Sequence, residues 1–87
     1  MKAKKDYILR KVGKQYVLVA TGRSSREFHG MIRLDESAAY VFELLKKETT
    51  PEELVSALMS RYPVEEAEAR SDIESFVAVL KEAGALE

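Results

Sequence analysis

Residues 27–37 of the chain read Glu27-Phe28-His29-Gly30-Met31-Ile32-Arg33-Leu34-Asp35-Glu36-Ser37. From Phe28 to Leu34 every second residue is apolar or glycine, which is the period-two pattern of a strand with one buried and one solvated face. Asp35 is a good helix N-cap, because its carboxylate accepts hydrogen bonds from the first free N–H groups. The pattern therefore predicts a strand over residues 27–34 that passes directly into a helix.

Two more strands are expected before the strand at residues 27–34, over residues 7–12 and 15–20. Both runs are rich in Tyr, Ile, Leu and Val, and only Gly13-Lys14 separates them. Glycine at the first position of a two-residue loop predicts a type II′ hairpin, because glycine adopts a positive φ without strain. Residues 1–6 are charged and are expected to form a frayed, flexible tail. Residues 21–26 are a polar connection.

Three helices are expected after the strand at residues 27–34, over about residues 36–47, 51–62 and 65–83. The second begins most clearly, with Thr50 as N-cap, Pro51 at the first helical position and Glu53 three residues after the cap. Gly84 fits the left-handed position after the third helix, with Leu86 folding back on its last turn. The side chains expected to face the core are Ala38, Val41, Phe42, Leu45, Leu54, Val55, Leu58, Met59, Tyr62, Ala69, Ile73, Phe76, Val77 and Leu80.

The order of elements predicts an α+β fold, a three-stranded antiparallel sheet followed by three helices (βββααα), similar to a winged helix-turn-helix. Eighty-seven residues are expected to form a single domain, residues 1–87. The chain contains no cysteine, which excludes disulfides and thiolate chemistry. It has no apolar run long enough to cross a bilayer and no signal-peptide pattern, so a cytoplasmic location is expected.

Charge divides the chain in two. Residues 1–33 carry nine bases and two acids, a net charge of +7, and residues 34–87 carry five bases and thirteen acids, a net charge of −8. A basic strand half therefore adjoins an acidic helical half.

Few residues suit catalysis. His29 is the only histidine and lies on the polar side of its strand, without a cysteine. The pairs Glu52-Glu53 and Glu65-Glu66 lie at helix starts, where the helix dipole accounts for them. There is no glycine-rich phosphate loop. We therefore expect no enzyme activity, no cofactor and no metal site.

Binding to another macromolecule is the remaining class of function. Helices and strands in this order can form a DNA-binding winged helix, but the opening of the third helix is acidic and repels phosphate. The basic strands leave non-specific phosphate binding open. For a peptide partner, the strand at residues 27–34 is expected at the sheet edge, where unpaired N–H and C=O groups accept another strand. Gly30 permits close approach of a partner backbone, or alternatively marks a bulge.

Several stretches in this order resemble the PqqD-like family. They are Tyr7-Ile8-Leu9-Arg10, Tyr16-Val17-Leu18-Val19, Phe28-His29-Gly30-Met31-Ile32, Leu34-Asp35-Glu36-Ser37-Ala38-Ala39, Thr50-Pro51-Glu52-Glu53-Leu54, Asp72-Ile73-Glu74-Ser75-Phe76 and Gly84-Ala85-Leu86. The resemblance covers about residues 7–87. Asp35 departs from the asparagine of many relatives, but both residue types cap helices.

The resemblance implies a non-catalytic peptide chaperone, a precursor-peptide recognition element that binds the leader of a ribosomally made peptide. It implies that the leader adds as a strand and that the modifying enzyme is a radical S-adenosylmethionine protein or another peptide-modifying enzyme, in pyrroloquinoline quinone synthesis or another peptide pathway. No nucleic acid or membrane partner is expected. The implied peptide-binding residues are Phe28, His29, Gly30, Met31, Ile32, Arg33 and Leu34, with Arg70, Asp72, Ile73 and Val77 on the exposed face of the third helix.

Two alternatives stay open from the sequence. One is a winged-helix DNA-binding or regulatory protein. The other is a dimerisation module in which the open edge pairs with its own copy, so that the chain is a monomer or a weak or swapped homodimer.

Overall fold

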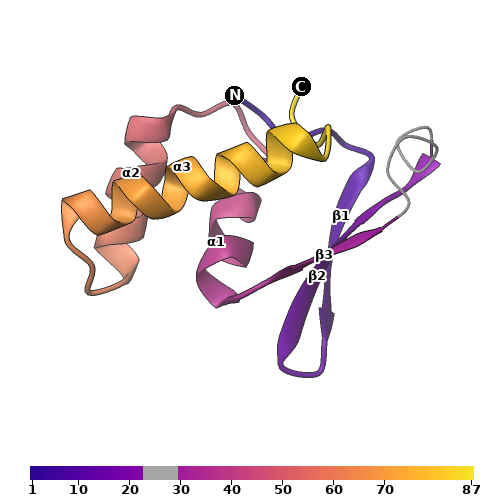
Figure 1. Ribbon diagram of the computed structural model, residues 1–87, viewed down its shortest axis with the longest axis horizontal. Helices are drawn as coiled ribbons and strands as arrows, with labels where there is room; N and C mark the ends of the chain where they lie inside the picture. Colours follow the sequence, from indigo (N-terminus) through magenta and orange to yellow (C-terminus); the bar gives the residue numbers. More distant parts are fainter. Residues whose placement is uncertain (23–29) are drawn as a thin grey trace.

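The computed structural model describes residues 1–22 and 30–87 and has the predicted α+β architecture (Figure 1). Three strands precede three helices, and the sheet forms one end of the molecule while the helices form the other. The similarity to a winged helix-turn-helix is a loose one. The elements are β1 (Tyr7–Val12), β2 (Gln15–Ala20), β3 (Met31–Leu34), α1 (Glu36–Leu44), α2 (Pro51–Arg61) and α3 (Glu66–Glu82).

The sheet is antiparallel with the order β1-β2-β3, so β2 lies in the middle. Val12 is opposite Gln15, and Gly13-Lys14 forms the loop between them. Gly13 has a φ of 63°, whereas Lys14 does not have a positive φ. These are the signs that a type II′ turn requires, and they distinguish it from type I′, in which both loop residues have positive φ. The hairpin prediction is confirmed.

The predicted caps at the first two helix starts are present. The Asp35 carboxylate accepts hydrogen bonds from the Ala38 N–H at 2.8 Å and from the Ser37 hydroxyl at 2.9 Å. The Thr50 hydroxyl accepts from the Glu53 N–H at 3.2 Å. The bonds from the Ala38 and Glu53 N–H groups each satisfy a backbone donor that the first turn of a helix leaves free. The helix α1 ends earlier than predicted, with Leu45 as its C-cap.

The end of α3 is a Schellman motif. Gly84 has a φ of 75°, its N–H donates to the Lys81 carbonyl at 3.0 Å, and the Ala85 N–H donates to the Leu80 carbonyl at 2.8 Å. Leu80 and Ala85 are both fully buried and supply the apolar contact of the motif. Leu86, which was expected to fold back on the last turn, forms a bridge with Ala3 and is partly buried against the core.

The expectation that residues 1–6 form a frayed tail is wrong. Ala3 forms an antiparallel bridge with Leu86, and its N–H donates to the Leu45 carbonyl at 2.8 Å. The Lys4 N–H donates to the Ala85 carbonyl at 2.8 Å, and Ala3 is only 5% exposed. Figure 1 shows the two ends of the chain close together at the same side of the molecule. This segment therefore belongs to the folded unit.

The core lies between the inner face of the sheet and the three helices. In Figure 1, α3 crosses over α1 and α2. Most of the predicted inward-facing positions are buried, although Met59 is 40% exposed and does not belong to the core. Within the described part, no helix is long and apolar enough to cross a membrane. The largest fully buried side chains are Phe42, Leu18, Leu45, Leu54, Ile73 and Leu80.

Candidate functional site: the free edge of β3 and its neighbouring groove

The strand β3 lies at the edge of the sheet. Within residues 1–22 and 30–87 it pairs with β2 alone, and its other side has no strand beside it. The structure therefore agrees with the predicted edge position, although β3 as described begins at Met31. An edge strand presents unpaired N–H and C=O groups to whatever approaches it.

The registers of the β1–β2 and β2–β3 pairs determine which backbone groups of β3 face the free edge. The turn bond of a type II′ hairpin joins the Gln15 N–H to the Val12 carbonyl, so that pair is hydrogen-bonded. Bonded and non-bonded pairs alternate along an antiparallel ladder. The bond from the Thr21 N–H to the Asp6 carbonyl, at 2.7 Å, fits the same alternation. Val17 and Val19 of β2 therefore bond to β1.

The residues between them on β2 bond to β3. Tyr16 is opposite Leu34 and Leu18 is opposite Ile32, so these two pairs carry the β2–β3 hydrogen bonds. The N–H and C=O groups of Met31 and Arg33 consequently point away from β2, toward the free edge. These four backbone groups are the ones that an added strand would pair with.

The side chains of β3 alternate as predicted. Leu34 is 7% exposed and Ile32 is half-buried against the core. Met31 is 69% exposed, and Arg33 is exposed on the same outer face. A strand added beside β3 would thus place alternate side chains on the helical side and on the outer side of the sheet.

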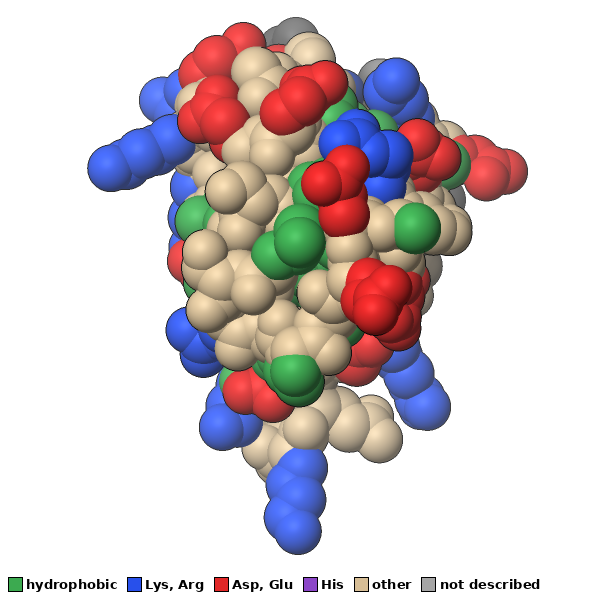
Figure 2. Space-filling view, turned by 90° about the vertical axis from the view of Figure 1, so that its left-hand side faces the viewer, with side chains coloured by type: hydrophobic (Ala, Val, Ile, Leu, Met, Phe, Trp, Pro, Cys, Tyr) green, Lys and Arg blue, Asp and Glu red, His purple; other side chains and the backbone are tan. Residues whose placement is uncertain are grey.

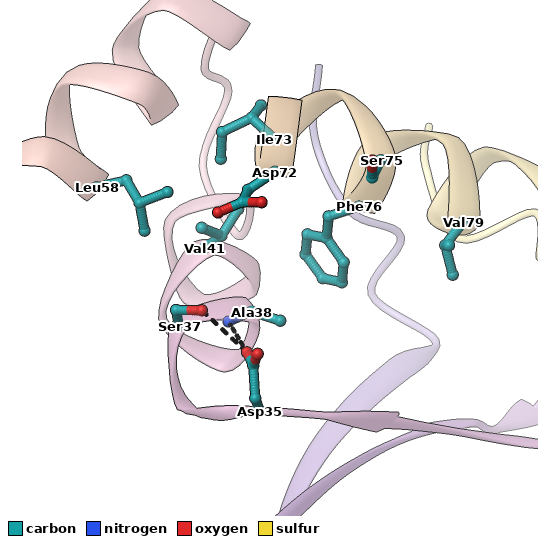
Figure 3. A pocket seen from close by; sticks show the side chains of 10 residues that line it. All are labelled: Asp35, Ser37, Ala38, Val41, Leu58, Asp72, Ile73, Ser75, Phe76 and Val79. Carbon is teal, nitrogen blue, oxygen red and sulfur yellow. Dashed lines mark hydrogen bonds between the residues drawn. The ribbon is translucent and has the colours of Figure 1, made fainter. Parts of the chain in front are cut away.

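A groove with a volume of about 300 Å³ opens where β3 ends, between the start of α1 and one side of α3 (Figure 3). In Figure 3, Phe76 and Val79 project from α3 toward the side on which β3 runs into Asp35. Val79 is 44% exposed and Phe76 is half-buried, so apolar surface is accessible here. The lining residues are Asp35, Ser37, Ala38, Val41, Leu58, Asp72, Ile73, Ser75, Phe76 and Val79.

The groove is apolar at its floor and polar at its rim. Val41 and Leu58 are buried side chains that belong to the core. Asp35 and Asp72 are exposed and place two carboxylates on the rim. Among residues 1–22 and 30–87, no lysine or arginine lines this groove. An apolar cleft with a few polar groups at its border is typical of a site that binds another molecule.

The structure brings together only part of the predicted site. Phe28 and His29 lie outside the described residues, and Gly30 is an exposed bend residue just before β3. Met31, Ile32, Arg33 and Leu34 form β3 itself.

Of the four predicted residues of α3, only Asp72 is both exposed and part of the groove lining. Arg70 is exposed, but it forms an ion pair at 3.6 Å with Glu66, one turn earlier in α3. Neither residue lines the groove. Residues two apart do not share a helix face, so Arg70 and Asp72 point in different directions.

Ile73 and Val77 do not lie on the exposed face of α3, and that expectation is wrong. They are 2% and 8% exposed. Together with Ala69 and Leu80 they form the stripe by which α3 packs on the rest of the core. Ile73 reaches the groove only as part of its floor.

Sequence reasoning did not assign Ser75, Phe76 and Val79 to the site. The sequence shows that Phe76 and Val79 are apolar, but only the structure shows that Val79 lies outside the buried stripe of α3. Phe76 and Val79 are three residues apart and extend the apolar arc of the helix beyond the face that packs on the core. An apolar arc wider than the packing face indicates a second contact surface.

The helical end of the molecule is acidic, as the charge distribution predicts. Figure 2 views the end where α2 and the start of α3 lie, and acidic side chains gather at its top and right with apolar side chains between them. In the described part, no group of three or more His, Cys, Asp or Glu side chains is arranged to hold a metal ion. The exposed acids of α2, of α3 and of the α3 N-cap include Glu52, Glu53, Glu65, Glu66, Glu68, Asp72 and Glu74.

Two solved structures have a similar fold. TbiB1 in complex with the TbiA(beta) leader peptide is 23% identical, with a TM-score of 0.77, and the match covers 100% of this chain and 95% of that one. Lasso peptide synthetase B1 complexed with the leader peptide is 27% identical, with a TM-score of 0.73, and the match covers 97% of this chain and 93% of that one. No curated protein matches the sequence.

The sequence itself matches a family model. Residues 15–86 match the model described as coenzyme PQQ synthesis protein D (PqqD). The match includes β2, β3 and all three helices, and hence both the free edge and the groove. The chain therefore belongs to the PqqD family.

Proposed function

We propose that this protein recognises the leader segment of a ribosomally made precursor peptide. The leader adds as a strand to the free edge of β3 and places side chains in the groove between α1 and α3. The observation that carries the proposal is the free edge itself, which lies beside an open apolar groove in a chain of the PqqD family. Both similar structures are complexes with leader peptides, which supports the same role here.

The two parts of the site contribute differently to binding. Each main-chain hydrogen bond contributes about 0.5–1.5 kcal/mol net, and only the N–H and C=O groups of Met31 and Arg33 are available on the described edge. Ordering a flexible leader opposes binding by about 1 kcal/mol or more per residue. The edge alone therefore holds a leader weakly. Apolar side chains in the groove supply the remaining affinity and the selectivity.

We further propose that the protein is a carrier and not a catalyst. It holds the leader while a modifying enzyme acts on the rest of the precursor. The resemblance to the PqqD-like family implies a radical S-adenosylmethionine protein or another peptide-modifying enzyme in this role, in pyrroloquinoline quinone synthesis or in another peptide pathway. Release of the product requires reversible binding, which favours affinities near the micromolar range, about −8 kcal/mol.

A DNA-binding role receives less support. The exposed surface at the start of α3 carries Glu66, Glu68 and Asp72, and such a surface repels phosphates. Self-association through β3 uses the same free edge and competes with the leader. Light scattering over a dilution series, with and without leader, distinguishes a self-pairing module from a monomeric carrier.

The test is a titration of the ¹⁵N-labelled protein with a synthetic leader from a precursor peptide encoded beside this protein. The amide signals of Met31 to Leu34 and of the groove side of α3, from Asp72 to Val79, are expected to shift together. Signals of the hairpin loop at Gly13-Lys14 serve as an internal control and stay unchanged. Binding that leaves both β3 and α3 unshifted contradicts the proposal.

A further inference from the structure

The groove side of α3 changes character along the helix. Glu68 and Asp72 are four residues apart and lie on one side of the helix, followed on that side by Phe76 and Val79. The first half of this row is acidic and exposed, and the second half is apolar and lines the groove. A peptide lying along this row therefore passes from an apolar surface to a negatively charged one.

The fold does not account for the charge of Asp72. Acids in the first turn of a helix are stabilised by the helix dipole, which accounts for Glu66 and Glu68. Asp72 lies beyond that turn. Among residues 1–22 and 30–87, none of the ion pairs includes Asp72.

Glu68, on the same side of α3, makes the negative charge of Asp72 unfavourable. Glu68 and Asp72 are like charges with the spacing i,i+4, an arrangement that destabilises a helix. A cation bound between them would relieve this repulsion. The other carboxylate of the groove, Asp35, already accepts two hydrogen bonds from the start of α1. Asp72 is therefore the groove carboxylate that is available to a ligand.

We propose that the leader segment recognised here carries a large apolar side chain and, close to it, a lysine or arginine that pairs with Asp72. This inference rests on the proposed function and names the chemistry of the peptide. The apolar side chain lies against Phe76 and Val79, and the cation reaches the Asp72 carboxylate. Because no basic side chain of the described residues lines the groove, an acidic peptide residue at the position of this cation is repelled by Asp72 and rejected.

The geometry also sets a spacing. Asp72 and Phe76 are four residues apart, which is about 6 Å along a helix that rises about 1.5 Å per residue. An extended peptide advances about 3.3 Å per residue, so two residues span the same distance. Residues two apart in a strand also point to the same side. The cation is therefore expected two residues from the apolar anchor.

The test is a selection of binders from a random twelve-residue peptide library displayed on phage. Three proteins are used as targets: the unaltered chain, Asp72→Lys and Glu74→Lys. Glu74 is a matched control, because it is also an exposed acid of α3 and does not line this groove. Selected peptides are synthesised and located by titration of the ¹⁵N-labelled targets, and circular dichroism verifies that each variant is folded.

The expected result has three parts. Peptides selected on the unaltered chain carry a lysine or arginine two residues from an aliphatic or aromatic residue, and Glu74→Lys selects the same pattern. Asp72→Lys selects glutamate or aspartate at that position instead. Asp72→Asn weakens a selected basic peptide about threefold, the effect of an exposed ion pair, and the difference disappears at about 1 M salt, where the Debye length is about 3 Å.

Two results would overturn the inference in distinguishable ways. If the selected peptides bind at β3 and the groove without a preference for basic residues, or keep that preference on Asp72→Lys, the role of Asp72 is wrong while the proposed function stands. If no selected peptide shifts the signals of residues 31–34 or of the groove side of α3, the proposed function fails together with this inference.

Discussion

The Tyr7 hydroxyl donates a 2.6 Å hydrogen bond to the Ala83 carbonyl. Tyr7 is the first residue of β1 and is 5% exposed, and Ala83 is the C-cap of α3. The bond therefore joins the beginning of the sheet to the end of the helix that borders the groove. It fixes one end of α3 relative to the sheet, while Ile73 and Leu80 hold the helix on the core.

Replacing Tyr7 by phenylalanine removes this bond and leaves the Ala83 carbonyl without its partner. We expect Tyr7→Phe to lower the free energy of unfolding by about 1–2 kcal/mol, measured by urea denaturation with an unchanged m-value. Tyr16→Phe is the control, because the Tyr16 ring contacts Lys11 but its hydroxyl makes no hydrogen bond within the described part. Equal stability of the two variants would show that the Tyr7–Ala83 bond contributes nothing.

Proline at Met31 tests the free backbone groups of β3 directly. The register places the Met31 N–H toward the free edge, so Met31→Pro removes a donor for the leader without breaking a bond to β2. We expect at least about fivefold weaker leader binding, since one main-chain bond contributes about 1 kcal/mol. Calorimetry measures the affinity.

Two further variants make the comparison specific. Met31→Ala keeps the N–H and is expected to bind the leader nearly as well as the unaltered protein. Ile32→Pro removes a bond to β2 and is expected to destabilise the fold instead, which circular dichroism and urea denaturation report. Leader binding by folded Met31→Pro at the original affinity would contradict strand addition through the Met31 N–H.

A charge at Val79 tests the groove. Val79 is 44% exposed, so Val79→Glu is expected to change the free energy of unfolding by less than about 0.5 kcal/mol. It places a carboxylate where the leader's apolar side chain lies, and we expect at least about tenfold weaker binding. Met59→Glu is the matched control, because Met59 is 40% exposed on α2 and does not line the groove. Equal effects of both variants on affinity would exclude the groove as the binding surface.

Asp35 has a structural role that can be separated from its charge. Asparagine also caps helices, so Asp35→Asn is expected to keep the stability within about 0.5 kcal/mol, whereas Asp35→Ala lowers it by about 1 kcal/mol. Thermal and urea denaturation of both variants provide the measurement. If Asp35→Ala is as stable as Asp35→Asn, the two hydrogen bonds at the start of α1 do not stabilise the fold.

The parts of the fold that local chemistry determines could be predicted from the sequence. The hairpin follows from Gly13, and the helix starts follow from Asp35 and Thr50, because each signal involves residues within a few positions of each other. The docking of residues 1–6 could not be predicted in this way. It depends on the pairing of Ala3 with Leu86, at the opposite end of the sequence.

Only part of the candidate site could be predicted, because the rest depends on how distant elements pack against one another. The edge position of β3 follows from the order of the strands, but the side of α3 that faces β3 depends on how the helix is rotated on the core. Ile73 and Val77 satisfy an apolar periodicity equally well whether they face the core or a ligand, and in the structure they face the core. The exposed row with Phe76 and Val79 emerges only once that rotation is known.

Amide hydrogen exchange of β3, followed by NMR with and without a saturating leader peptide, tests the central claim most directly. In the free protein, the account predicts slow exchange at Ile32 and Leu34, which bond to β2, and fast exchange at Met31 and Arg33. With leader bound, Met31 and Arg33 are predicted to become at least about tenfold more protected, because their N–H groups pair with the added strand. A leader that binds and leaves the exchange of Met31 and Arg33 unchanged would contradict strand addition at this edge.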